Sequence, residues 1–246
     1  MNFYSVIIGS ELLNGRRVDS HFQKINQKIV SNGYHHKGSF VIEDKPEFIT
    51  EIFNFIKQDP DAVMFSFGGI GATPDDYTRE CAANAFSSGE MEFHEDAKSI
   101  ILDKFGKDAY PYRINMANLP IGAKLLANPI TNVPGFYLED RYFFLPGFPN
   151  MAHPMVDEAF EKLFPKQKSA QRVSFVVYDS ENSIIELMEQ LPSDIGASSL
   201  PKIEGEKRST ILSISHIDSE YVTKNIELIE NYFTHYSIEY KRVEEL

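Results

Sequence analysis

Two adjacent carboxylates follow a glycine-rich turn in residues 68–78, GGIGATPDDYT. The turn comes directly after the apolar run Ala62–Phe67, so its glycines stand at the end of a predicted buried strand. Glycine lets backbone amides approach a phosphate closely, but Asp75 and Asp76 would repel a diphosphate unless a cation lay between them. Magnesium is typically held by one or two carboxylates together with phosphate oxygens. We therefore predict a divalent metal, Mg, Mn or Co, on Asp75 and Asp76, and a diphosphate held by Gly68, Gly69, Gly71, Thr73 and Thr78.

The same stretch has a structural alternative. Thr73 suits the N-cap of a helix, Pro74 suits the first helical position, and Asp76 completes a capping box. Acidic residues in a first turn also stabilise the helix dipole by about 0.3–1 kcal/mol. Under this alternative the two aspartates only begin a helix, and their spacing alone does not separate the two hypotheses.

Residues 9–15, GSELLNG, form the second candidate stretch. They follow the apolar run of residues 3–8, so Gly9, Ser10 and Glu11 stand at the end of another predicted strand. Glu11 is the candidate to orient an attacking water, with a surface turn at Asn14-Gly15 as the alternative. Asp19 is either a helix cap or a ligand contact.

The third stretch, residues 132–151, contains two Pro-Gly pairs on either side of a predicted strand at 142–145. Such pairs commonly mark turns. Two of them beside one strand indicate backbone amides at a common edge. The candidate residues are Asn132, Pro134, Gly135, Pro146 and Gly147.

Alternating strands and helices position these stretches. Strands are predicted at 3–8, 37–42 and 62–67, and helices at 46–58 and 150–163. A further helix follows Asp19, with Phe22, Ile25, Ile29 and Val30 on its apolar face. This order predicts an α/β domain over residues 1–165, with a mainly parallel sheet and ligands at the carboxyl ends of its strands.

Residues 164–171, FPKQKSAQ, are a predicted linker. Beyond them, strands are predicted at 173–178, 210–215 and 237–243, and helices at 183–191 and 218–233. The order β-α-β-α-β predicts a small split α+β domain over residues 170–246.

Composition excludes several classes of protein. With 24 basic and 36 acidic residues, the chain lacks the basic surface of a nucleic-acid-binding protein. The single cysteine, Cys81, excludes a disulfide framework and a CxxC zinc site, and it is interpreted as a buried inert thiol. No stretch reaches the roughly 20 apolar residues of a membrane span. We expect a cytoplasmic, soluble protein.

The three stretches together resemble the molybdopterin-binding domain superfamily, and most closely the N-terminal half of the competence/damage-inducible CinA family. The family motif GDELLxG is similar to GSELLNG, GGxGPTxDDxT to GGIGATPDDYT, and the PGF and LPGxP segment to NPITNVPGFYLEDRYFFLPGFP. The sequence departs from the motifs at Ser10, His21, Ala72 and Asn150. Loss of polar or acidic groups there is expected to weaken metal binding.

The resemblance implies a Rossmann-like three-layer α/β/α domain and a small-molecule ligand, either a nucleotide or a pterin. It also implies metal-dependent hydrolysis of ADP-ribose to AMP and ribose 5-phosphate. The alternatives are a molybdopterin-binding protein of cofactor biosynthesis and a non-catalytic nucleotide-binding module. The family's second domain is likened to a KH module, which binds RNA through a GxxG loop. Residues 170–246 contain no GxxG, so RNA binding is not expected here. The resemblance and the 19 Phe and 12 Tyr residues favour a homo-oligomer, although these aromatics can equally fill the core.

Overall fold

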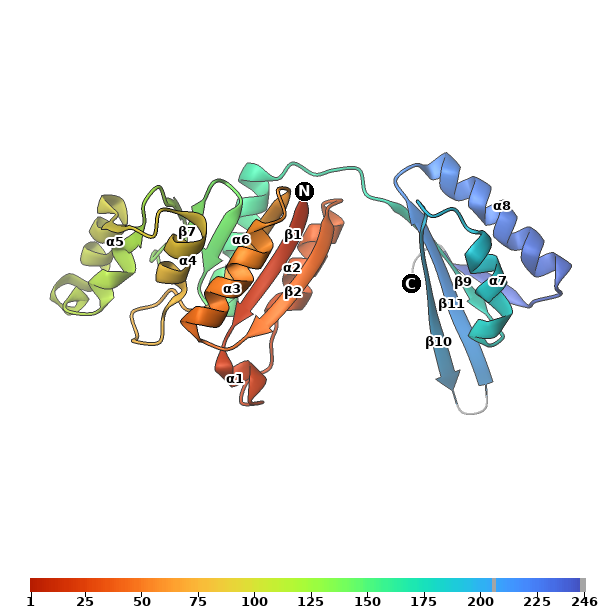
Figure 1. Ribbon diagram of the computed structural model, residues 1–246, viewed down its shortest axis with the longest axis horizontal. Helices are drawn as coiled ribbons and strands as arrows, with labels where there is room; N and C mark the ends of the chain where they lie inside the picture. Colours follow the sequence, from red (N-terminus) through yellow and green to blue (C-terminus); the bar gives the residue numbers. More distant parts are fainter. Residues whose placement is uncertain (205–206, 244–246) are drawn as a thin grey trace. The chain divides into compact units, whose positions relative to one another are not determined.

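A computed structural model describes residues 1–204 and 207–243. The chain divides into two compact units, Met1–Gln167 and Lys168–Leu246, each with its own sheet and helices (Figure 1). The boundary falls inside the polar segment 164–171 that the sequence indicates as a linker. None of the helices in the described ranges is long and apolar enough to cross a membrane.

A six-stranded sheet runs through the first unit. Four of its strands are parallel, as predicted. Two further strands add to one edge of the sheet by antiparallel pairing. In spatial order the strands are β2 His35–Ile42, β1 Asn2–Ile8, β3 Ala62–Phe67, β8 Tyr142–Leu145, β7 Gly135–Leu138 and β6 Lys124–Leu126.

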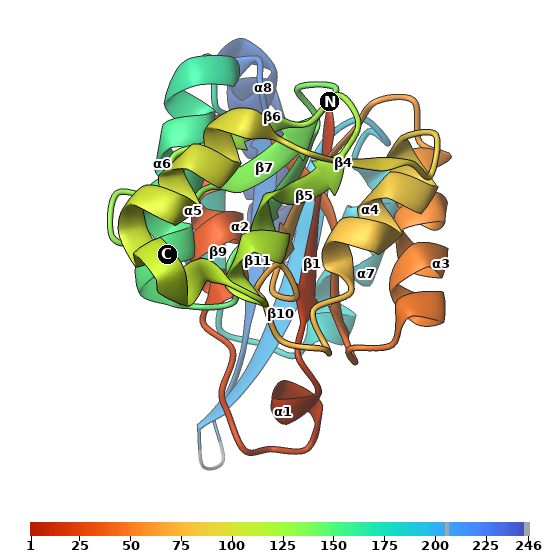
Figure 2. The same cartoon turned by 90° about the vertical axis from the view of Figure 1, so that its left-hand side faces the viewer.

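Helices cover both faces of this sheet, so the predicted three-layer α/β/α architecture is confirmed (Figure 2). Successive residues of β1 point to opposite faces, as pleating requires. Phe3 packs with α2 His21–Ser31 and α6 Pro149–Leu163. Tyr4 faces the other layer, which consists of α3 Pro46–Lys57, α4 Thr78–Phe86 and α5 Glu95–Phe105.

Short elements complete the first unit. α1 Ser10–Leu13 follows β1, and two 3₁₀ helices, η1 Gly106–Ala109 and η2 Arg113–Ala117, follow α5. Strands β4 Met91–Phe93 and β5 Asn118–Pro120 pair with each other outside the main sheet.

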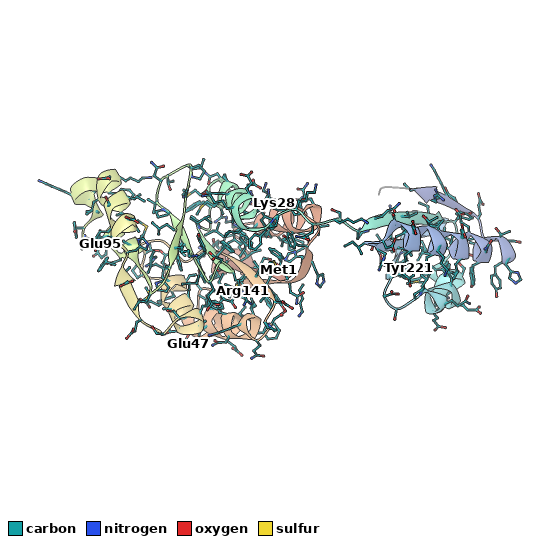
Figure 3. All side chains as sticks on the ribbon, turned by 90° about the horizontal axis from the view of Figure 1, so that it is seen from above. Met1, Lys28, Glu47, Glu95, Arg141 and Tyr221 are labelled. Carbon is teal, nitrogen blue, oxygen red and sulfur yellow. The ribbon has the colours of Figure 1, made fainter. Side chains whose placement is uncertain are left out.

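Side chains fill the space between sheet and helices in the first unit (Figure 3), and aromatic residues are prominent among those that are fully buried. Most of the largest fully buried side chains are phenylalanines, so the core accounts for much of the aromatic content that suggested self-association. The predicted apolar face of α2 is partly wrong, because Phe22 and Val30 are 48% and 52% exposed. The buried side chains of α2 are His21, Ile25 and Ile29.

The second unit is a four-stranded antiparallel sheet in the order β10-β11-β9-β12. The α+β prediction is confirmed, but the predicted order lacks β10. That strand contains Pro201, which disfavours a central strand and is tolerated here because β10 lies at an edge. The elements are β9 Gln171–Val177, η3 Glu181–Ile184, α7 Ile185–Gln190, β10 Gly196–Glu204, β11 Lys207–His216, α8 Ser219–His235 and β12 Tyr240–Val243.

Candidate functional site

A pocket of about 710 Å³ opens where β1, β3 and β8 end. β2 and β3 lie on opposite sides of β1, so this is a point at which the strand order reverses, the usual ligand position in an open α/β sheet. Ten of the residues singled out in the sequence line it: Glu11, Gly68, Gly69, Gly71, Thr73, Asp75, Asp76, Pro134, Pro146 and Gly147.

Glycine is required where β3 leaves the sheet. Gly68 and Gly69 have φ values of 103° and 69°, in the left-handed region that side chains disfavour. A Cβ on Gly68 would lie 2.5 Å from the carbonyl oxygen of Ile8. A Cβ on Gly69 would lie 2.2 Å from Thr78 Oγ1. The lack of a side chain at both positions therefore lets the glycine-rich loop, residues 68–73, lie close against β1 and α4.

Residues at the start of α4 donate hydrogen bonds to the carbonyls of this loop. Thr78 donates from Oγ1 to Gly68 O and from its amide to Gly69 O, each at 3.0 Å. Arg79, which is 9% exposed, donates to Ile70 O at 2.6 Å and to Gly71 O. Thr78 and Arg79 therefore fix the loop rather than line the pocket, and burial lowers the pKa of Arg79.

The amides in the middle of the loop, unlike these carbonyls, lack hydrogen-bond partners in the described part of the protein. Within residues 1–204 and 207–243, no hydrogen bond is formed by the amides of residues 69–72. Carbonyls held on one side and amides left without protein acceptors are the arrangement in which a glycine-rich loop binds an anion.

The two aspartates do not begin the following helix. α4 starts at Thr78 with Tyr77 at its N-cap position, so the helix-capping alternative is wrong. Instead, Asp76 Oδ2 accepts from the Thr73 amide at 2.7 Å and from the Thr73 hydroxyl at 2.6 Å. Asp75 is exposed at the pocket, and the Thr73 side chain lowers the pKa of its carboxyl. The turn thus presents both carboxylates beside the unused amides.

Glu11 lies opposite, at the end of β1, and pairs with Arg17 at 3.4 Å. Arg17 also donates to Gly147 O at 2.9 Å, and its guanidinium lies 5.7 Å from the Phe148 ring centre. It therefore ties the end of β1 to the end of β8.

Ser10, where the CinA-like motif has an acidic or threonine residue, is bonded to a neighbouring carboxylate. Its amide donates to Asp44 Oδ2 at 2.6 Å, and its hydroxyl accepts from the Asp44 amide at 3.2 Å. Asp44 follows β2 and lines the pocket. An acidic group is thus present at this corner of the site despite the serine.

The carboxylates do not form a ready-made metal site. In the part of the chain that the structure describes, no group of three or more His, Cys, Asp or Glu side chains could hold a metal ion. Asp75 and Asp76 supply the one or two carboxylates that Mg²⁺ uses when phosphate oxygens complete its shell. The residues therefore fit a metal that arrives with a phosphate ligand.

The remaining candidates lie outside the pocket lining. Gly9 donates its amide to Ile42 O at 3.0 Å. Asp19 caps α2, accepting from the amides of His21 and Phe22 at 2.9 and 3.0 Å. Asn132 has φ 61° in the turn beside the pocket, and a Cβ on Gly135 would lie 2.5 Å from Phe144 O. None of these four residues lines this pocket.

Several lining residues were not predicted. Arg17, Asp44 and Lys104 add charge, and Phe105, Met116, Phe148 and Met151 add apolar surface. Asn128 also lines the pocket; its Oδ1 accepts from the amides of Ile130 and Thr131 and so shapes the turn. Asn128 stands in the quoted NPITNVPGF stretch, whereas no sequence signal links Lys104 to this site.

Two histidines lie near the rim of the pocket, His21 buried and His153 half-buried. The His21 ring stacks on Phe67 at 4.5 Å and makes a contact of 3.3 Å with Gly147 O, while His153 lies edge-on to it at 5.4 Å. Burial lowers the pKa of both histidines. Asn150, another departure from the family motifs, is exposed and does not line the pocket.

Comparisons with known proteins agree with this architecture. Residues 5–166 match the family described as "probable molybdopterin binding domain". CinA-like proteins of Geotalea uraniireducens and Trichormus variabilis are each 30% identical, over 64% and 69% of this chain and 39% and 42% of their own length. The chain therefore spans less than half of these relatives.

A solved structure of the CinA protein from Thermoplasma acidophilum, whose function is stated to be unknown, is also similar. It is 29% identical with a TM-score of 0.61, covering 67% of this chain and 99% of that one. With the family match over residues 5–166, these similarities show that the chain belongs to the molybdopterin-binding domain family, in which its relatives include CinA-like proteins.

Proposed function

We propose that the first unit binds a diphosphate-bearing nucleotide and hydrolyses its diphosphate bond with the help of a divalent metal ion. The observation that carries this proposal is the glycine-rich loop, where the unused amides of residues 69–72 adjoin the carboxylates of Asp75 and Asp76. Amides alone would suit any anion. Two carboxylates beside them favour an anion that brings a cation with it.

The side chains have separate tasks in this proposal. The loop amides hold the diphosphate, and Asp75 and Asp76 hold the metal, which supplies positive charge beside the phosphate oxygens. Glu11 accepts a proton from the attacking water, and Arg17, paired with it at 3.4 Å, keeps its carboxylate oriented. ADP-ribose, which the CinA resemblance implies, is the proposed substrate, giving AMP and ribose 5-phosphate.

The family match favours a second candidate, a molybdopterin-type ligand. A pterin carrying a phosphate uses the same loop amides, and its flat ring suits the apolar wall formed by Phe105, Met116 and Phe148. In this case the protein binds or modifies the pterin in cofactor assembly and does not hydrolyse ADP-ribose.

The test is release of AMP from ADP-ribose by purified protein, with Mg²⁺, Mn²⁺ or Co²⁺ and with EDTA as control. We expect metal-dependent release that is lost in Glu11→Gln. Absence of turnover on ADP-ribose and on other dinucleotides would refute the hydrolase proposal. A thermal shift by molybdopterin but not by ADP-ribose would then favour the second candidate, because a ligand stabilises only the state that it binds.

A further inference from the structure

A second depression lies on the other side of the glycine-rich loop. It measures about 560 Å³ and is lined by residues 72–74 together with Asp108, Tyr110, Tyr112 and Arg113. Ala72 and Thr73 line both this depression and the pocket described above. The loop therefore forms a wall shared by two neighbouring sites.

Two exposed tyrosines line the depression. Tyr110 and Tyr112 lie between η1 and η2 and are 59% and 68% exposed. A single exposed aromatic residue needs no functional explanation. Here, however, two phenol rings line one depression beside a loop whose amides lack protein acceptors.

Arg113 adds a positive charge to the same depression. Its guanidinium lies 4.8 Å from the ring centre of Phe105 and donates to Asp108 O at 3.1 Å. Phe105 in turn lines the first pocket. Arg113, which lines the second depression, thus contacts a residue that lines the first pocket.

We propose that Tyr110 and Tyr112 bind the heterocyclic ring of a two-ended ligand. The diphosphate of this ligand crosses the glycine-rich loop, its ribose phosphate end occupies the first pocket, and Arg113 neutralises the phosphate nearer the ring. The inference rests on the proposed function, since it assumes that the loop holds a diphosphate. It adds the recognition of a nucleoside ring outside the first pocket.

Comparing ligands with and without a heterocyclic ring tests the ring site separately from the diphosphate site on which it rests. AMP, ribose 5-phosphate and pyrophosphate are titrated calorimetrically into wild type and Tyr110→Ala/Tyr112→Ala. Aromatic stacking of a base contributes enough that we expect AMP binding to weaken about 10-fold. Binding of ribose 5-phosphate and pyrophosphate should not change. Tyr110→Phe/Tyr112→Phe keeps both rings and should bind AMP like wild type.

Tyr178→Ala is the matched control, since Tyr178 is 51% exposed in the second unit. If wild type binds pyrophosphate and the double alanine variant binds AMP as wild type does, the ring-binding role of Tyr110 and Tyr112 is refuted while the proposed function stands. If wild type binds no pyrophosphate, the diphosphate site is refuted, and the two-ended ligand fails with it.

Discussion

Replacing Gly69 by alanine tests the packing of the glycine-rich loop most directly. The added Cβ would lie 2.2 Å from Thr78 Oγ1 and 3.2 Å from Thr78 Cβ, and Gly69 has φ +69°. The left-handed backbone alone costs an alanine about 1 kcal/mol. Displacing Thr78 also weakens its two 3.0 Å hydrogen bonds to the loop, at about 1 kcal/mol each. We expect Gly69→Ala to lower the free energy of unfolding by about 3 kcal/mol.

Gly122→Ala is the control, because Gly122 has φ +83° and a Cβ there would meet no atom within 4 Å. Gly122→Ala has the cost of a left-handed backbone without a steric clash, so we expect its free energy of unfolding to fall by about 1 kcal/mol. Urea unfolding followed by circular dichroism measures both, since the chain has no tryptophan to report fluorescence. Equal losses in the two variants would show that the close contact with Thr78 does not govern the loop.

Three further predictions concern other parts of the first unit and the whole chain. Arg79→Ala leaves the carbonyls of Ile70 and Gly71 without their buried donor, and urea unfolding should show a loss of about 3 kcal/mol in the free energy of unfolding; an unchanged midpoint would contradict this role. Desolvation lowers the pKa of buried His21 and half-buried His153 below the ordinary 6.5, so the native state favours their neutral form and loses stability as the pH falls below 6.5. The melting temperature should therefore drop less between pH 7.5 and pH 5.5 in His21→Gln/His153→Gln than in wild type, and an equal drop would contradict the assignment. The family resemblance predicts a homo-oligomer, and a monomeric mass by light scattering at micromolar concentration would refute it.

The position of the site follows from local sequence signals. The apolar runs at 3–8 and 62–67 end directly at glycines, and parallel strands must present those ends at one edge of the sheet. Glu11, the glycine-rich loop and Gly147 therefore line one pocket, although more than 130 residues separate the first from the last.

Other features depend on contacts that sequence spacing does not encode. Thr73 and Asp76 have the spacing of a capping box, yet their hydrogen bonds close a turn before α4, because Thr78 is drawn to the carbonyls of the loop. Lys104 lines the pocket because α5 packs beside it, and its Nζ donates to Thr131 O. Nothing near Lys104 in the sequence indicates that neighbour.

The second unit shows a different limit. Periodicity identified β9, β11 and α8 because each buries an apolar face. β10 pairs with β11 over its whole length but lies at the edge of the sheet and has mostly exposed side chains. An edge strand of this kind has no apolar alternation to reveal it.

The most direct test of the central claim is a calorimetric titration of pyrophosphate into wild type and Asp75→Asn/Asp76→Asn, with and without Mg²⁺. Asparagine can still accept the two Thr73 hydrogen bonds, so the loop should stay folded. We predict that Mg²⁺ strengthens pyrophosphate binding to wild type. The double variant should gain nothing from Mg²⁺ and, without metal, should bind pyrophosphate about fivefold more tightly than wild type, because two negative charges are gone. A double variant with the same Mg²⁺ dependence as wild type would contradict the assignment of Asp75 and Asp76 as the metal ligands.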